Sequence, residues 1–398
     1  MRTSTANAFN SGIATLTTRQ SELAETQAQL TTGKRVAKAS DDPAAAARAE
    51  RALAGVMRSE TSLRAVEASR IAMTQTESAI GGAGELLQQA REALVEAGDA
   101  SFSDAERQVL ADKLRGIREQ LFAVANRSDG AGGHLFAGQG ATQPPFVDAP
   151  GGVQFNGVGG QLLTEAGTAL PLSTDGAATW LNARTGNGVF ETKAAAGVSG
   201  AWIANGNVVD PAALTGSSYT LQVTVAAGTT TYAVLKDGLP TAVTAAAYTS
   251  GQAITVDGMA VSVSGAPASG DRFDIVPSTA SLSVFDSLDK AVTDLSTAGR
   301  STAQRLQALG DNLRNIDSVM ATLRSARSRS GGALNMADSE SERLASLKLI
   351  HQTERANAED LDMVQAISSF QNQQTGYDAA LKSYSMVQRI SLFQYING

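Results

Sequence analysis

The chain has 398 residues, 32 basic and 39 acidic side chains, a formal net charge of −7 and no cysteine. The missing cysteines exclude a disulfide scaffold, a thiolate zinc site and a thiol nucleophile, and two histidines leave little material for a histidine metal site. The acidic balance predicts no nucleic-acid partner, and no apolar run reaches the roughly 18–20 residues of a membrane span.

The first 139 residues are predicted to be helical, because they contain a single proline. Proline costs about 3 kcal/mol and glycine about 1 kcal/mol in a helix interior relative to alanine. Asp42 is placed to cap a helix that starts at Pro43 and continues to about Gly98. Residues 103–106 (Ser-Asp-Ala-Glu) form a capping-box pattern, which predicts a further helix to about Ser128.

The middle of the chain is predicted to be β. Residues 140–280 hold eight of the nine prolines and 20 of the 38 glycines. Residues 219–235 alternate around Gly228 and predict a hairpin, and residues 254–263 predict another with Asp257-Gly258 as its turn. Residues 271–276 predict one more strand. This segment is expected to be a solvent-facing β-domain with Trp180 and Trp202 as its core anchors.

The last part of the chain, residues 281–398, is predicted to be helical again. The patterns run over residues 282–329 and from 339 to about 393, with Gly331-Gly332 as a candidate break. The predicted fold class is therefore mainly α with an inserted β-domain: a long antiparallel helical rod or coiled coil made from the N- and C-terminal segments, plus a β-rich middle domain.

Both chain ends carry apolar stripes and little charge. Residues 1–30 contain four charged side chains and residues 363–398 contain three. The stripes follow heptad spacing and include, as expected subunit-assembly residues, Leu16, Leu23, Leu30, Ile367, Phe370, Tyr377, Leu381 and Tyr384. A helix pair within one chain would explain the stripes, but its outer face should carry charge. The alternative that we favour is burial of both faces by neighbouring subunits. Membrane-surface binding would need a Lys/Arg-rich polar face, which is missing.

Several motifs at characteristic positions resemble the flagellin superfamily. Near the N-terminus they lie at residues 1–5, 30–35 and 40–44, and Leu-Phe-Ala-Gly at 135–138 resembles the entry into the family's β region. The exit strand is matched by residues 269–273, and the C-terminal helix by residues 359–362, 371–375 and 391–395, which include Leu392 and Phe393. The resemblance is strongest to the hook-associated protein 3 branch, the flagellin-like protein of the hook–filament junction. Flagellins themselves usually begin and end differently.

The resemblance implies five segments: an N-terminal assembly helix (1–40), the two halves of a helical rod (41–139 and 281–358), an inserted β-rich domain (140–280) and a C-terminal assembly helix (359–398). It also implies a structural subunit in a homo-oligomeric ring that joins a neighbouring hook-associated protein to flagellin. An export chaperone is expected on the C-terminal helix. The N-terminus lacks a secretory signal pattern, so we expect export through the flagellar type III apparatus to an extracellular location.

No pattern in the sequence predicts an enzyme or a cofactor. Asp41 and Asp42 are neighbours that helix capping explains, and neither histidine has ligands at metal-binding spacing. The basic residues Arg324, Arg327 and Arg329 form a solvated patch or contact an acidic neighbouring subunit. Two other functions stay open: a flagellin or flagellin-like filament subunit, and a secreted helical protein whose β-domain binds a glycan through Asn, Thr and Trp180.

Overall fold

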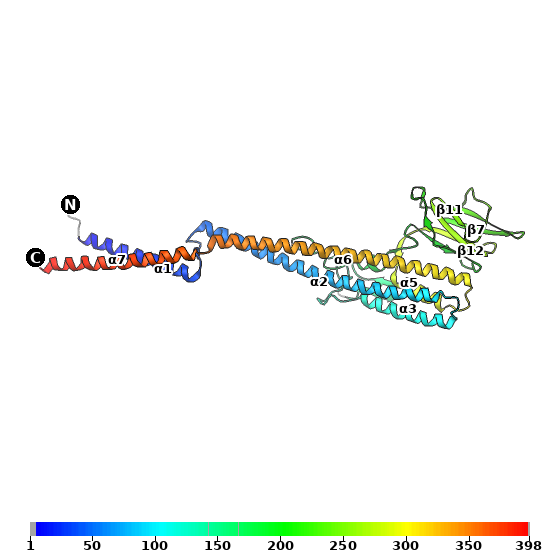
Figure 1. Ribbon diagram of the computed structural model, residues 1–398, viewed down its shortest axis with the longest axis horizontal. Coiled ribbons are helices and arrows are strands. Elements are labelled where there is room, and N and C mark those ends of the chain that lie inside the picture. Colours follow the sequence, from blue (N-terminus) through cyan, green and yellow to red (C-terminus); the bar gives the residue numbers. More distant parts are fainter. Residues whose placement is uncertain (1–4, 142, 166, 397–398) are drawn as a thin grey trace. The chain divides into compact units, whose positions relative to one another are not determined.

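The computed structural model describes residues 5–141, 143–165 and 167–396, with the side chains of residue 7 and of residues 10–386 within those ranges. The chain divides into two compact units. The terminal unit comprises residues 1–64 and 341–398, and the larger unit comprises residues 65–340. Figure 1 shows long helices and a β-rich middle region, so the predicted fold class is confirmed.

In the terminal unit, helix α1 (Thr5–Thr32) packs against helix α7 (Met363–Ile396). The unit also contains the start of α2 (Pro43–Ala97) and the end of α6 (Thr302–Glu359), and both of these helices continue into the larger unit. The start of α2 at Pro43 agrees with the helix predicted from proline position.

The candidate break at Gly331-Gly332 does not occur, because α6 runs through both glycines without interruption. Ala326, Ser330, Ala333 and Ala337 are buried at helical spacing on either side of these glycines. The packing of this continuous stripe outweighs the roughly 1 kcal/mol that each glycine costs. The breaks lie instead at residues 297–301 and 360–362.

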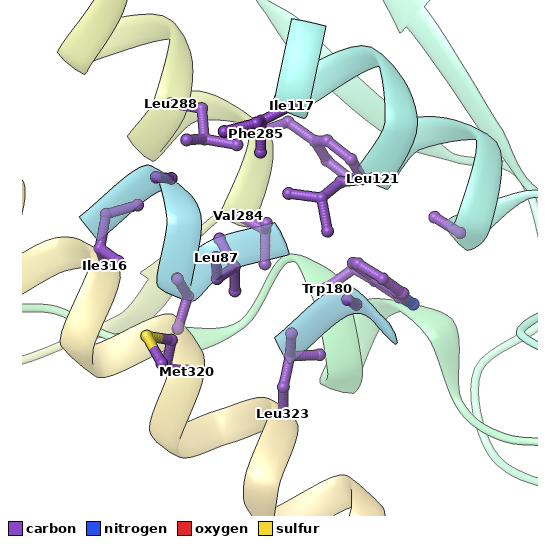
Figure 2. Close-up of a cluster of buried hydrophobic side chains, with 14 of the residues drawn as sticks. Leu87, Ile117, Leu121, Trp180, Val284, Phe285, Leu288, Ile316, Met320 and Leu323 are labelled. Carbon is purple, nitrogen blue, oxygen red and sulfur yellow. The ribbon is translucent and has the colours of Figure 1, made fainter. Parts of the chain in front are cut away.

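The helical part of the larger unit is built from α2, α3 (Asp104–Ala125), α5 (Val284–Ser296) and α6. Ser103 and Glu106 form the predicted capping box at the start of α3. These helices enclose a core that includes Leu87, Leu121 and Phe285, drawn in Figure 2.

The first part of the β-rich segment joins this helical core. Its elements are β1 (Phe146–Ala149), which pairs with β2 (Gly152–Phe155), the short helix α4 (Gly176–Trp180), and β3 (Ala183–Arg184), which pairs with β14 (Ala280–Leu282). The indole ring of Trp180 stacks on Phe285 with centroids 6.0 Å apart.

The second part of the segment has a separate core. Its main sheet has the strand order β10-β8-β7-β13-β4, with β9 beside β8, and a smaller sheet has the order β11-β12-β5, with β6 beside β12. The elements are β4 (Phe190–Ala194), β5 (Ala201–Ile203), β6 (Asn207–Val208), the 3-10 helix η1 (Pro211–Ala213), β7 (Tyr219–Ala226), β8 (Thr229–Lys236), β9 (Leu239–Pro240), β10 (Ala246–Ala247), β11 (Ala253–Val256), β12 (Met259–Gly265) and β13 (Arg272–Pro277).

Both predicted hairpins form, as β7–β8 and β11–β12. The second has Asp257 and Gly258 at φ angles of 39° and 79°, the pair of positive values that a two-residue turn of this type requires. The expectation for the tryptophans is wrong. Trp180 belongs to the helical core, and Trp202 on β5 is half-buried and outside the β-domain core.

Candidate assembly interface

The α1–α7 pair holds all eight of the predicted assembly residues whose side chains are described. Leu16, Leu23 and Leu30 of α1 are half-buried. Between the last two, the Thr26 hydroxyl donates a hydrogen bond of 2.8 Å to Gln373 Oε1 of α7. Gly12 lies against the ring of Tyr384, where an added Cβ would come within 3.3 Å of a ring carbon. The inward face of α1 therefore mixes leucines with small and polar residues.

On α7, the predicted stripe splits into two edges. Phe370, Tyr377 and Tyr384 are half-buried, but Ile367 and Leu381 are 47% and 41% exposed. The inward positions before and between the aromatic residues are taken by the smaller or more polar side chains of Ala366, Gln373 and Ala380. Leu392 and Phe393 lie outside the residues whose side chains the structure describes.

Six of the eight predicted residues are thus half-buried in the helix pair and two, Ile367 and Leu381, are exposed; their role in subunit assembly stays a prediction. The inward positions of α1 also include Gly12 and Thr26, and the larger residue that follows each of them, Ile13 or Gln27, is exposed. The pattern chose the larger side chains, but the close approach of the two helices favours small ones. As a result, α7 has an outer edge that consists of Met363, Ile367, Gln374 and Leu381, beside the face that contacts α1 and exposed to solvent.

A backbone joint connects the two segments where α1 and α6 end. Lys34 and Asp360 form an antiparallel bridge. The Arg35 amide donates to the Glu359 carbonyl at 2.8 Å, and the Leu361 amide donates to the Gly33 carbonyl at 3.0 Å. Gly33 has φ +70°, a left-handed conformation that other residues adopt at a cost. These hydrogen bonds hold the segment that follows α1 against the segment that follows α6.

Side chains cap the helices that leave this joint. Asp42 Oδ1 accepts a hydrogen bond from the Ala45 amide at 3.0 Å, and Arg35 lies 3.3 Å from the other carboxylate oxygen. The amide of Ala45 first, and then the guanidinium of Arg35, hold the pKa of Asp42 below its usual value. Asp362 Oδ1 accepts from the amides of Val364 and Gln365 at the start of α7. This second cap was not predicted, although an aspartate before an apolar run is the usual signal for one.

The described residues show no arrangement typical of a catalytic or metal centre. They contain no group of three or more His, Cys, Asp or Glu side chains that could hold a metal ion. His351 packs against Gly55 and lies 3.3 Å from Glu354. In the predicted basic patch, Arg327 pairs with Glu77 at 2.6 Å. Within the described ranges, no helix has the length and apolarity needed to span a bilayer.

Comparisons with known proteins agree with this architecture. Residues 3–141 match the family model described as the bacterial flagellin N-terminal helical region. The chain is 37% identical over 153 residues to flagellar hook-associated protein 3 of Salmonella typhimurium, and this match covers 38% of the chain and 48% of the relative. The corresponding Escherichia coli protein is 34% identical over 152 residues, with the same coverage. The chain therefore spans about half the length of the curated relatives that it matches.

Solved structures extend the match. FlgL of Xanthomonas campestris has a TM-score of 0.67 at 27% identity, over 76% of this chain and 99% of that one. The flagellar junction protein FlgL from Legionella pneumophila has a TM-score of 0.63 at 26% identity, over 69% and 93% of the two chains.

These similarities define the class of proteins that the chain resembles: flagellin-like proteins with a β-rich insert between helical flanks. Within that class, its resemblance to flagellar hook-associated protein 3, the FlgL junction protein, is confirmed.

Proposed function

We propose that the chain is a structural subunit of the bacterial flagellum, an adaptor at the hook–filament junction that links a neighbouring hook-associated protein to flagellin. The similarity to hook-associated protein 3 supports the location. The observation that carries the role is the outer edge of α7. It holds Met363, Ile367 and Leu381 exposed in a helix with little charge. Apolar side chains arranged in this way favour contact with another protein.

The terminal helices fold fully when neighbouring subunits cover them. In the single chain, Thr26 of α1 and Ala366 of α7 are buried. The leucines on the same face of α1 and the aromatic residues on the same face of α7 remain half-exposed. A pair with so little buried apolar surface is marginal in water. Fully burying a Leu, Ile or Met side chain contributes roughly 1.5–3 kcal/mol, so completing the burial of each half-exposed residue contributes roughly 1 kcal/mol. Contact with neighbouring subunits completes that burial. The free energy gained offsets the conformational entropy that α1 and α7 lose when they become ordered.

The five segments then have different roles. Segments 1–40 and 359–398 assemble with other subunits, and segments 41–139 and 281–358 form the rod that carries the inserted domain at 140–280. Asp42 and Pro43 start the rod immediately after the joint. Subunits form a homo-oligomeric ring, and the assembly surface includes Leu392 and Phe393. The chain is not an enzyme and needs no cofactor.

Export precedes assembly in this proposal. The chain leaves the cell through the flagellar type III apparatus with its termini unfolded, and an export chaperone holds the C-terminal helix. Proline-free and cysteine-free termini with few charges are compatible with passage through a narrow channel. The extracellular flagellum is the final location.

Deletion of the gene tests the role directly. We expect intact hooks with short or absent filaments, and flagellin shed into the medium, with recovery when the gene is supplied in trans. Normal filaments in the deletion strain would contradict the proposal. Purified chain that grows long filaments on its own would instead support a filament-forming subunit.

The glycan-binding alternative loses one of its expected binding residues, because Trp180 is 0% exposed and lies in the helical core.

A further inference from the structure

A groove runs along α6 in the larger unit, from Gly310 to Arg329. Its volume is about 1130 Å³, and its other wall is made by loops and short elements of the inserted segment. Four arginines from three elements line it, Arg91 of α2, Arg184 of β3, and Arg314 and Arg329 of α6, against two carboxylates, Asp175 and Asp317. In a protein with a net charge of −7, this concentration of guanidinium groups is a local reversal of sign.

Two of these arginines lack a carboxylate partner within the part of the chain that the structure describes. Arg91 pairs with Asp317 at 2.8 Å, and Arg314 pairs with Asp311 at 2.9 Å. No ion pair of Arg184 or Arg329 is found among the described side chains, and Arg329 donates to the Ser325 hydroxyl. The groove therefore favours a ligand that carries negative charge.

Buried polar atoms in the groove wall also lack partners. Thr174 is 6% exposed and its hydroxyl has no hydrogen-bond partner. Arg314 is 8% exposed and its Nε has none either. Buried polar groups are normally hydrogen-bonded, so the Thr174 hydroxyl in the inserted segment and the Arg314 Nε–H on α6 are unpaired polar groups on the two sides of the groove.

A matching acidic surface lies on α2 of the same unit. Glu85, Glu92 and Glu96, which we call the acidic stripe, follow one another at helical spacing and are exposed. No ion pair of these three residues is found among the described side chains. Glu92 is one residue beyond Arg91, so it projects about 100° around the helix from the arginine that lines the groove. The stripe and the groove therefore lie on different faces.

The acidic stripe and the groove also match in their position along the helix axes and in their length. The ion pair between Arg91 and Asp317 places the middle of the stripe beside the middle of the groove. The stripe covers roughly 16 Å and the groove roughly 28 Å, at about 1.5 Å per helical residue. A stripe on one copy can thus enter the groove of a parallel neighbour without a large axial shift. Such head-to-tail contacts close into rings or continue as helices.

We propose that the acidic stripe of one chain docks in the arginine groove of a second copy of this chain. Carboxylates of Glu85, Glu92 and Glu96 then meet Arg184 and Arg329, the two exposed groove arginines for which no carboxylate partner is found among the described side chains. The contact gives the lateral bond between subunits of the proposed ring, and in that respect it rests on the proposed function. It uses the larger unit, whereas the outer edge of α7 belongs to the terminal unit.

Disulfide trapping tests the contact, since the chain has no cysteine of its own. Gln89 lies within the stripe and Ala321 lines the groove, and neither carries charge. Purified full-length Gln89→Cys and Ala321→Cys chains are mixed at high concentration under mild oxidation. We expect a disulfide-linked heterodimer at least about tenfold faster than from Gln89→Cys with the exposed control Val109→Cys. No excess over the control pair would overturn the proposal.

Charge reversal supplies the second readout. Arg184→Glu with Arg329→Glu in the Ala321→Cys chain should slow cross-linking about tenfold, and so should Glu92→Arg with Glu96→Arg in the Gln89→Cys chain. Mixing the two reversed chains should restore the rate. Failure of this restoration would contradict direct pairing. Retention on immobilised alginate that is lost in the groove variant, with no disulfide, would assign the groove to an acidic polysaccharide and overturn the proposal.

The trapping result and the deletion phenotype are independent. A specific disulfide with normal filaments in the deletion strain would reject the junction role and keep the contact. Filament loss in that strain without a disulfide would keep the junction role and reject the contact.

Discussion

Replacing Leu381 by aspartate separates the stability of the single chain from the stability of the assembly. Leu381 is 41% exposed and lies on the outer edge of α7, away from the face that contacts α1. Full burial of a leucine contributes roughly 1.5–3 kcal/mol, so losing the part that is already buried costs about 1 kcal/mol in the single chain. In the assembly the new carboxylate would be enclosed without a partner, and an uncompensated buried charge costs about 3–5 kcal/mol per subunit.

The difference of about 2–4 kcal/mol corresponds to at least a roughly 30-fold loss of assembly at each contact. Circular dichroism of the purified Leu381→Asp chain should remain close to wild type, because the larger unit does not contain this residue. Electron microscopy and motility should show no functional junction. Leu381→Met keeps the apolar volume and is the matched control, which should assemble normally. Motile flagella built with Leu381→Asp would place the assembly surface elsewhere and refute the reasoning.

Three further predictions concern the joint and the helical core. Gly33→Ala should increase protease cleavage near the joint, because φ +70° costs an alanine about 1–2 kcal/mol, and Gly33→Asn should have a smaller effect. Phe285→Ala should lower the free energy of unfolding by about 3–5 kcal/mol in urea titrations, since the ring is fully buried; an effect below about 1 kcal/mol would contradict its central place. Hydrogen bonding from Arg118 lowers the pKa of Asp148, so this pair stabilises the fold at neutral pH and its contribution is lost as the pH falls through that pKa. Asp148→Asn should therefore flatten acid unfolding between about pH 5 and 2, and an unchanged profile would show that the pair contributes nothing.

Local chemistry explains which parts of the fold could be predicted. The capping box at Ser103 and the Asp257-Gly258 turn depend on neighbouring residues, so their patterns were sufficient. Continuity of α6 through Gly331-Gly332 depends on tertiary packing of the flanking alanines, which no local rule contains. The same holds for Trp180, whose place in the helical core is set by contact with Phe285, about 100 positions away in the chain.

The face of α1 that packs against α7 was predicted in part. Leu16, Leu23 and Leu30 were located by their spacing, because leucines on one helix face mark its buried side. Gly12 and the pair of Thr26 and Gln373 were missed, since hydrophobic patterns ignore small and polar residues that allow two helices to approach closely. The groove arginines could not be found either, because they converge from α2, β3 and α6 only after folding.

Amide hydrogen exchange along the chain tests the central claim most directly, namely that α1 and α7 become stably folded on assembly. In the purified monomer, we predict fast exchange over residues 5–32 and 363–396, and strong protection in α3 and α5, whose core is buried. In isolated flagella, the terminal segments should slow by at least about 100-fold. Terminal helices that are protected equally in the monomer and in the assembly would contradict the account.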